Sequence, residues 1–528
     1  MMSLPPTAEP APRGAPTVDS SQFRSQMGQI SRHSAVFFAG TLFTAVASYL
    51  FKIFLARVLG SEALGLYALG MTIVGFAGIF NALGIPQAAT RFVALYTATG
   101  KMAELRSLFV RGSGYLILAN LALGLAVALL GPWVVTRAYH APELKAYMPL
   151  FALVMAGTAF SGFLGQALQG FKDVSRRTVI TNFVGTPLMM IITLVLVSRG
   201  LGLWGYIFAQ VVSSAVIIVL LGIAVWRLTP AAARDWSGPV PPLESQVWAF
   251  SATAFGIGLL EFLLAQVDKI LIGVFINARE VGIYAVATTI VAFIPVALQS
   301  VNQIFSPTIA DLHARGQQEL LGRLYQTLTK WILGFTLPLA AVVIVFARPL
   351  MRIFGAEFEP GWIVLIIGTL GQLVNCGTGS VGYLLMMSGN QGRLMRVQTV
   401  MTVVMILLNL LMIPKLGILG AVLATAITNV ATNAWNLREV RASLGLSPYN
   451  RTYGDLLLPG CAAIVIAVLM RTLAFPTHLV WLYILVAIAI AYIIFAGVAI
   501  LLGLGPDDRL ILNAIYARFR GLTRVGEI

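Results

Sequence analysis

The stretch LGSEALGLYAL, residues 59–69, has a counterpart much later in the chain, INAREVGIYAV, residues 276–286. When Gly65 is aligned on Gly282, a tyrosine follows two positions later in both copies. Each copy lies between two long apolar runs, so each is predicted to join two membrane-crossing helices. The fold is therefore expected to contain the same hairpin twice.

A second match supports this internal repeat. Residues 202–209, GLWGYIFA, align with residues 417–424, GILGAVLA, at nearly the same offset, and Arg176 aligns with Arg393. An even number of predicted spans separates the copies, so both halves would cross the membrane in the same direction. Parallel repeats are related by an axis along the membrane normal, an arrangement typical of transporters with a site between the halves.

The composition is that of an integral membrane protein. Of the 528 residues, 58% are hydrophobic and 10% are charged, whereas soluble chains average about 25% charged residues. Uninterrupted apolar runs of about 20 residues indicate helices, because barrel strands would alternate apolar and polar residues. We predict an all-α polytopic membrane protein with about fourteen transmembrane helices, arranged as two parallel six-helix lobes plus two C-terminal helices.

The predicted organisation follows from these runs. The expected spans are 34–56, 65–86, 111–131, 148–169, 179–198, 203–225, 248–276, 282–306, 331–351, 362–388, 397–413, 419–437, 457–474 and 481–503. The expected segments are a disordered cytoplasmic tail (1–30), an N-terminal lobe (31–226), a cytoplasmic linker (227–247), a C-terminal lobe (248–440), helices 13 and 14 (441–503) and a cytoplasmic C-terminal tail (504–528).

Charge distribution predicts the orientation. Most of the 35 lysines and arginines fall in loops on the same side as the N-terminus. The excess of positive residues in cytoplasmic loops then places both termini in the cytoplasm. The net charge of +15 is thus a topology signal, and no nucleic-acid partner is expected.

Four short motifs resemble a known superfamily. They are ARVLG (56–60) with GLY (65–67), and DKILIG (268–273) with VGIY (281–284). Over about residues 34–503 the chain resembles the multidrug/oligosaccharidyl-lipid/polysaccharide exporter superfamily, and within it the polysaccharide transporter branch of Wzx-type flippases.

The resemblance implies a function and a location. Such proteins move polyprenyl-pyrophosphate-linked oligosaccharide from the cytoplasmic to the outer leaflet of the bacterial inner membrane, by alternating access between two lobes. The implied partners are the lipid-linked oligosaccharide, the lipid bilayer, and polysaccharide polymerase and export proteins.

Lys52 and its repeat counterpart Lys269 are the first candidate site residues. A charge at mid-membrane costs about 2.5–3.5 kcal/mol on insertion scales and usually faces a cavity or a partner. In one interpretation the two lysines line opposite walls of a cavity and bind a pyrophosphate. In the other, both extend to the outer surface along their flexible stems.

Glu261 and Asp268 are candidates for ion coupling. Seven residues apart, they lie about 20° from each other around a helix and share a face. They are predicted either to carry a coupling Na⁺ or H⁺ or to form structural ion pairs. No cofactor is expected beyond such an ion.

Three further residues are candidates for contacting substrate. Arg91 is predicted either to meet phosphate on the cytoplasmic side or to act as a positive anchor there. Gln372 and Asn375 are predicted either to bind sugar or to pack between helices, the commoner use of intramembrane amides.

Enzymatic function is not expected. The four histidines are scattered, and no metal-ligand spacing, phosphate-binding loop or nucleophile elbow occurs. The alternatives that stay open are a drug/cation antiporter of the same superfamily and, less favoured, a membrane glycan polymerase or ligase. The sequence does not identify the glycan, the ion or the oligomeric state.

Overall fold

The computed structural model describes residues 20–234, 240–473, 480–503 and Asp508, and the regular elements within these ranges are helices. The first half contains α1 (Ser20–Ala82), α2 (Ile85–Thr99), α3 (Met102–Arg137), η1 (Pro142–Tyr147), α4 (Met148–Gly170), α5 (Val174–Thr178), η2 (Val179–Gly185), α6 (Thr186–Ser198), α7 (Gly202–Leu228) and α8 (Ala231–Arg234). The second half contains α9 (Ser245–Phe275), α10 (Ala278–Val291), α11 (Val296–Ala314), α12 (Gln318–Val345), α13 (Ala347–Arg352), η3 (Ala356–Gly361), α14 (Trp362–Thr378), α15 (Val381–Met387), α16 (Gln391–Leu416), α17 (Ile418–Leu444), η4 (Arg451–Leu456), α18 (Leu457–Thr472) and α19 (Val480–Leu501).

The predicted all-helical polytopic fold is confirmed. Among the described residues, 12 helices are long and apolar enough to cross a membrane, or 13 if the bent pair α10–α11 forms one span. One candidate, Phe43–Ala82, is 40 residues long, about twice the length that a crossing needs. Its backbone leaves helical geometry at Gly60 (φ 83°, ψ 174°). Counting it as two spans raises the total from 13 to 14.

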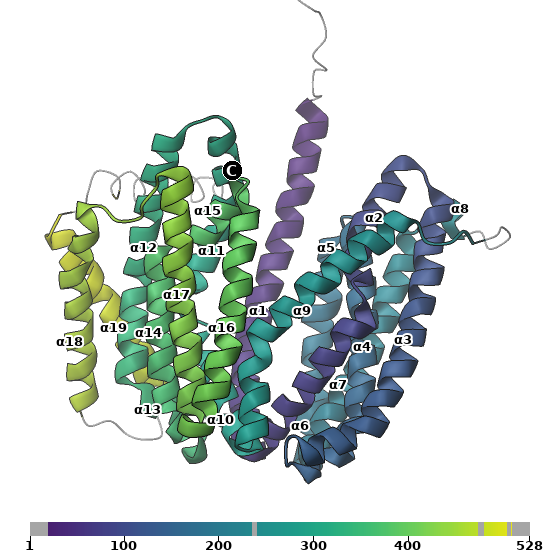
Figure 1. Cartoon of the computed structure of the whole chain (residues 1–528), viewed down its shortest axis with the longest axis horizontal. Coiled ribbons are helices and arrows are strands. Elements are labelled where there is room, and N and C mark those ends of the chain that lie inside the picture. Colours follow the sequence, from purple (N-terminus) through teal and green to yellow (C-terminus); the bar gives the residue numbers. More distant parts are fainter. Residues whose placement is uncertain (1–19, 235–239, 474–479, 504–507, 509–528) are drawn as a thin grey trace, which may run out of the picture.

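The helices form two lobes with shared elements between them (Figure 1). Helices α3–α7 stand on one side and α12–α17 on the other. Helix α1 packs against α9 and α10 in the middle. Helices α18 and α19 pack against α12 on the far flank of the second lobe. We call the end where α1 bends at Gly60 the crossing end. The opposite end, where Lys101, Arg234 and Arg315 lie, is called the basic end.

The repeated glycines meet each other at the crossing end. A Cβ atom on Gly65 would lie 1.6 Å from the carbonyl oxygen of Ala278, and one on Gly282 would lie 2.0 Å from that of Ser61. Only hydrogen fits at either position. Gly60 provides the break in α1, whereas Gly65 lies within helical backbone and serves the contact between the repeats.

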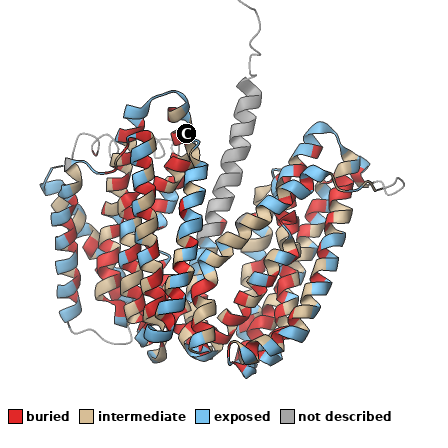
Figure 2. Cartoon of the chain, viewed as in Figure 1, coloured by how far each residue is buried: buried red, intermediate tan, exposed pale blue. Residues whose placement is uncertain are grey.

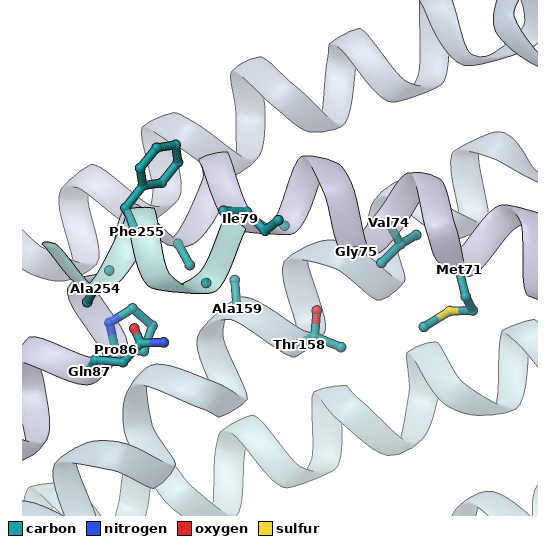
Figure 3. A pocket seen from close by; sticks show the side chains of 14 residues that line it. Met71, Val74, Gly75, Ile79, Pro86, Gln87, Thr158, Ala159, Ala254 and Phe255 are labelled. Atoms are coloured by element: carbon teal, nitrogen blue, oxygen red, sulfur yellow. The ribbon is translucent and has the colours of Figure 1, made fainter. Parts of the chain in front are cut away.

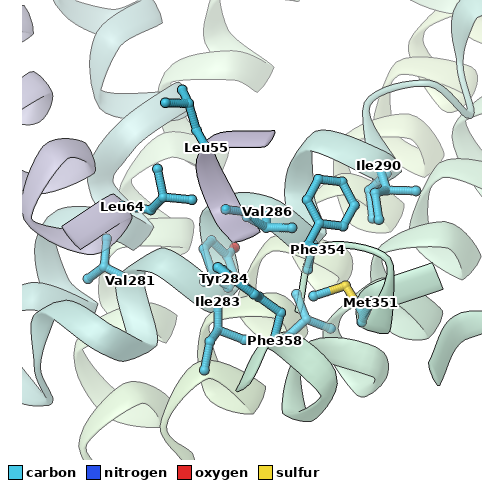
Figure 4. Close-up of a cluster of buried hydrophobic side chains, with 14 of the residues drawn as sticks. Leu55, Leu64, Val281, Ile283, Tyr284, Val286, Ile290, Met351, Phe354 and Phe358 are labelled. Carbon is cyan, nitrogen blue, oxygen red and sulfur yellow. The ribbon is translucent and has the colours of Figure 1, made fainter. Parts of the chain in front are cut away.

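An apolar core surrounds this contact. Leu55 and Leu64 of α1 face Val281 and Tyr284 of α10, and Phe354 closes one side (Figure 4). Figure 2 shows that burial is concentrated where helices pack against one another. This core joins the two halves of the chain rather than lying within one lobe.

The outward faces suit lipid. Leu118, Leu121, Leu125 and Leu129 recur on one face of α3, and each is at least 60% exposed. Exposing four leucines in a row to water would be unfavourable, whereas lipid tails are as apolar as leucine side chains. The protein is therefore a multi-pass membrane protein.

Several boundaries differ from the prediction. Helix α1 already begins at Ser20, inside the segment 1–30 expected to be disordered; residues 1–19 lie outside the described residues. The span predicted at 362–388 is broken at Gly379 (φ 68°). The span predicted at 282–306 bends by 53° between α10 and α11.

We expect the Gly65→Ala substitution to destabilise the protein by about 1–3 kcal/mol, because the added methyl group overlaps backbone that side-chain motion cannot move aside. Thermal unfolding of the purified protein would measure this loss. Gly114→Ala is the matched control, since a Cβ at Gly114 of α3 meets no atom within 4 Å. Equal melting temperatures for the two variants would contradict the close crossing.

Candidate substrate site between the two repeats

Lys52 reaches from the first repeat to the second. It lies on α1 two turns before Gly60, and its ammonium donates hydrogen bonds to the hydroxyl of Thr289 and to the carbonyl oxygen of Ala285 (3.4 Å). Both acceptors belong to α10. Thr289 lies about 16 Å along α10 from its first residue, so the ammonium points away from the crossing end.

Lys269 is held differently. Its ammonium donates to the Oε1 atom of Gln266 on the same helix at 2.9 Å. Gln266 lies one turn further from the crossing end, so Lys269 also points into the bundle. Neither lysine therefore extends towards the crossing end as the surface interpretation requires.

The two lysines come from opposite repeats to one region. Lys52 contacts α10, and α9, which carries Lys269, packs against both α1 and α10. Lys52 and Lys269 are each only partly buried. This arrangement of two cations without a shared carboxylate favours an anionic group between them.

Asp268 belongs to a separate buried contact. Its Oδ2 atom accepts a hydrogen bond from the hydroxyl of Tyr284 at 2.7 Å, and its Oδ1 atom accepts one from the backbone N–H of Lys269 at 2.8 Å. The side chain is 7% exposed. Glu261 is exposed on the same helix, so the structure places the two predicted coupling carboxylates in different environments.

The other predicted substrate residues lie elsewhere. The guanidinium of Arg91 on α2 lies over the ring of Phe250 on α9, 5.1 Å from its centroid. Gln372 accepts a hydrogen bond from the side chain of Asn375 on the same helix at 3.1 Å. These contacts fit the anchoring and packing interpretations, and the structure does not bring these three residues to the lysines by any described contact.

A cross-lobe contact at the crossing end was not predicted. The carboxylate of Glu357 in η3 accepts hydrogen bonds from the backbone N–H (2.9 Å) and the hydroxyl (2.7 Å) of Ser61. The Nε atom of Arg57 donates to the carbonyl oxygen of Ile353 at 2.8 Å. Glu357 thus caps the helix that restarts after Gly60.

Thr289, which accepts a hydrogen bond from Lys52, was also not predicted as a site residue, although it is the repeat counterpart of Thr72.

A cavity of about 370 Å³ lies between α1, α2, α4 and α9 (Figure 3). Small residues such as Gly75, Gly78 and Ala159 form much of its wall, and Gln87 and Thr158 supply polar side chains. The described residues that line it carry no charge. Neither Lys52 nor Lys269 is among the described lining residues, so the cavity is not formed by the lysine pair itself.

We expect Tyr284→Phe to cost more stability than Tyr67→Phe, its repeat counterpart. Removing the Tyr284 hydroxyl takes a donor from a buried carboxylate, at about 1–3 kcal/mol. The hydroxyl of Tyr67 instead bonds to the neutral side chain of Gln210, for which about 0.5–1.5 kcal/mol is typical. Chemical denaturation of both variants would measure the difference, and a larger loss for Tyr67→Phe would show that Asp268 does not depend on this donor.

Comparison with known proteins agrees with the fold. Residues 54–360 match the family model described as polysaccharide biosynthesis protein. The succinoglycan biosynthesis transport protein ExoT of Rhizobium meliloti (strain 1021) is 25% identical over 337 residues, 61% of this chain and 63% of that protein. The match thus spans less than two thirds of that relative.

Solved structures share the architecture. The lipid II flippase MurJ in an inward closed conformation has a TM-score of 0.68 at 14% identity, over 88% of this chain and 98% of that one. An inward-facing multidrug resistance MATE family transporter of the MOP superfamily has a TM-score of 0.61 at 15% identity, over 76% and 94%. The resemblance drawn from the repeat motifs is confirmed, and the chain belongs to the polysaccharide biosynthesis protein family.

Proposed function

We propose that the protein is a flippase that moves polyprenyl-pyrophosphate-linked oligosaccharide from the cytoplasmic to the outer leaflet of the bacterial inner membrane. The observation that carries the proposal is the pair Lys52 and Lys269, contributed by opposite repeats on helices α1 and α9, which pack against each other. Membership of the polysaccharide biosynthesis family supports a saccharide substrate. The basic end faces the cytoplasm in this proposal, as the positive-inside rule expects.

Two cations suit a pyrophosphate for an energetic reason. Attraction between opposite charges grows as the surrounding dielectric falls, and the lysines lie among apolar helices. Charge-assisted hydrogen bonds to phosphate are roughly twice as strong as neutral ones. A pyrophosphate can therefore displace the neutral acceptors that Lys52 and Lys269 contact here.

Alternating access follows from the way the lobes meet. The lobes are closely joined at the crossing end, where Gly65 meets Gly282 and Glu357 caps Ser61. Release of these contacts while the basic end closes would expose the lysines to the outer leaflet. That movement would break the two hydrogen bonds that Ser61 donates to Glu357.

The driving force is proposed to act through Asp268. The chain has no phosphate-binding loop for ATP, so an ion gradient or consumption of the product must supply the energy. A buried carboxylate is able to take up H⁺ or Na⁺. Glu261, which is exposed, is the weaker candidate.

A drug/cation antiporter is the second candidate, and the shared fold with a multidrug transporter is the observation in its favour. The two functions predict different deletion phenotypes. A flippase deletion strain accumulates lipid-linked oligosaccharide in the inner leaflet, whereas an antiporter deletion strain becomes drug-sensitive without that accumulation.

We expect Lys52→Gln and Lys269→Gln each to reduce export about tenfold or more, since a lost charge-assisted hydrogen bond is worth about 1.5–3 kcal/mol. Accumulation of lipid-linked oligosaccharide in the complemented deletion strain would measure export, with protein abundance measured in parallel. Lys145→Gln is the control, because Lys145 is exposed in η1. Full export by the double variant would refute a role for the lysine pair.

We expect Asp268→Asn to abolish any dependence of transport on an ion gradient, because the amide cannot take up a cation. Transport into vesicles would be measured with the proton and sodium gradients imposed separately. Glu261→Gln should retain the dependence. If wild-type transport ignores both gradients, the coupling role of Asp268 is excluded while the flippase function stands.

A further inference from the structure

A polar helix face follows directly after the part of α10 that holds Lys52. Ala285 and Thr289, which accept the hydrogen bonds of Lys52, lie one turn apart on α10. Beyond them the exposed positions recur every three or four residues, as one face of a helix requires. Between residues 291 and 303 these positions are Ala292, Phe293, Val296, Gln299, Ser300 and Gln303. We call Gln299, Ser300 and Gln303 the amide face of α11.

The opposite side of α11 is packed within the second lobe. Helix α11 packs on α12 and α15, and Leu298 and Asn302 are buried there. The amide face is turned away from these helices. At the bend between α10 and α11, the ring of Phe293 contacts the ring of Tyr49 on α1, with centroids 5.3 Å apart. The amide face is therefore the continuation of the side of α10 that meets Lys52 of the first repeat.

The carboxamides of this face lie at membrane depth without partners. Ala278–Val291 and Val296–Gln303 together form the bent candidate span. Within the part of the chain that the structure describes, the side chains of Gln299 and Gln303 form no hydrogen bond. Hydrocarbon supplies neither donors nor acceptors, so two free carboxamides are unfavourable against lipid. The face is thus suited to water or to a polar ligand, unlike the leucine face of α3.

We infer that the amide face binds uncharged sugar residues of the transported glycan. The inference rests on the proposed function, because it takes its ligand from the lipid-linked oligosaccharide. In that molecule the first sugar is bonded directly to the pyrophosphate, so a pyrophosphate at Lys52 places this sugar near Thr289. The crossing end is closed by Gly65 and Gly282. The following sugars therefore extend towards the basic end, which is the direction in which α11 runs.

The chemistry of the face matches sugar hydroxyl groups. A carboxamide has one carbonyl acceptor and two N–H donors, so each glutamine is able to donate to one hydroxyl and accept from another. The hydroxyl of Ser300 donates to the carbonyl oxygen of Val296 at 2.8 Å and keeps its oxygen as an acceptor. The ring of Phe293 is 40% exposed and offers an apolar surface to the C–H groups of a sugar ring.

The absence of charge in this stretch selects against acidic sugars. Residues 291–310 contain no charged side chain. A carboxylated sugar on the amide face would lose water without gaining a counter-ion, which is unfavourable in a region of low dielectric. The charge of the substrate is instead matched at the lysines, and the glycan that follows it meets neutral groups.

Binding of two synthetic lipids to the purified full-length protein tests the inference. One probe is polyprenyl pyrophosphate, and the other carries a chain of three neutral hexoses on the same pyrophosphate. We expect the wild-type protein to bind the hexose probe more tightly. Gln299→Leu combined with Gln303→Leu should weaken binding of the hexose probe about tenfold, the size expected for two lost neutral hydrogen bonds. Its affinity for polyprenyl pyrophosphate should not change.

Three controls accompany the double variant. Gln318→Leu makes the same change at the exposed first residue of α12, outside the amide face, and should bind both probes as the wild type does. Lys52→Gln should weaken both probes, because it acts on the pyrophosphate. Since the two carboxamides have no partner among the described residues, the double variant should also keep the wild-type melting temperature.

The outcomes separate the inference from the proposed function. Equal binding of the two probes by the wild type, or an undiminished preference in the double variant, would overturn the inference while the flippase function stands. So would tighter binding of a hexuronate chain than of the hexose chain, or a loss of melting temperature that accompanies weaker binding of both probes. Failure of the wild type to bind either probe would contradict the proposed function and the inference with it.

Discussion

The contact on which the rest of the structure depends is the backbone crossing of Gly65 and Gly282. Equivalent residues of two repeats related by a twofold axis approach each other where the axis passes, so a side chain there would meet the opposite repeat's backbone. Both positions must therefore be glycine at the same time. The crossing sets how closely α1 and α10 approach, and Lys52 can reach Thr289 only because these helices are in contact.

Sequence was sufficient for features that depend on one helix at a time. Apolar length located the spans, and the non-helical backbone at Gly60 agreed with a turn. The break at Gly379 could not be predicted, because its exposed carbonyl groups are satisfied by distant residues. The hydroxyls of Tyr325 and Tyr453 donate to the carbonyl oxygens of Thr378 and Gly377, both at 2.7 Å. Without these donors a mid-membrane break would leave unpaired backbone groups.

In the candidate site, too, features of a single helix could be predicted from sequence and contacts between helices could not. Lysine and aspartate within apolar runs are rare enough to be noticed in one sequence, but their partners Thr289 and Gln266 are ordinary residues that only packing selects. The repeat also has an informative exception. Asp268 aligns with Phe51, which packs 6.2 Å from the ring of Tyr206. The carboxylate thus belongs to the second repeat alone, so any ion coupling would act through one lobe.

Lys52 and Lys269 differ in what their ammonium groups bond to, and this difference decides which of them would transmit substrate binding to the crossing end. Lys269 bonds within its own helix, so capture of its ammonium by a phosphate leaves the contacts between repeats unchanged. Lys52 bonds to α10 of the opposite repeat, so the same capture removes a bond that joins the repeats. A ligand shifts a conformational equilibrium only through contacts that differ between the two states. Of the two lysines, Lys52 is therefore the one through which pyrophosphate binding would weaken the closed crossing end.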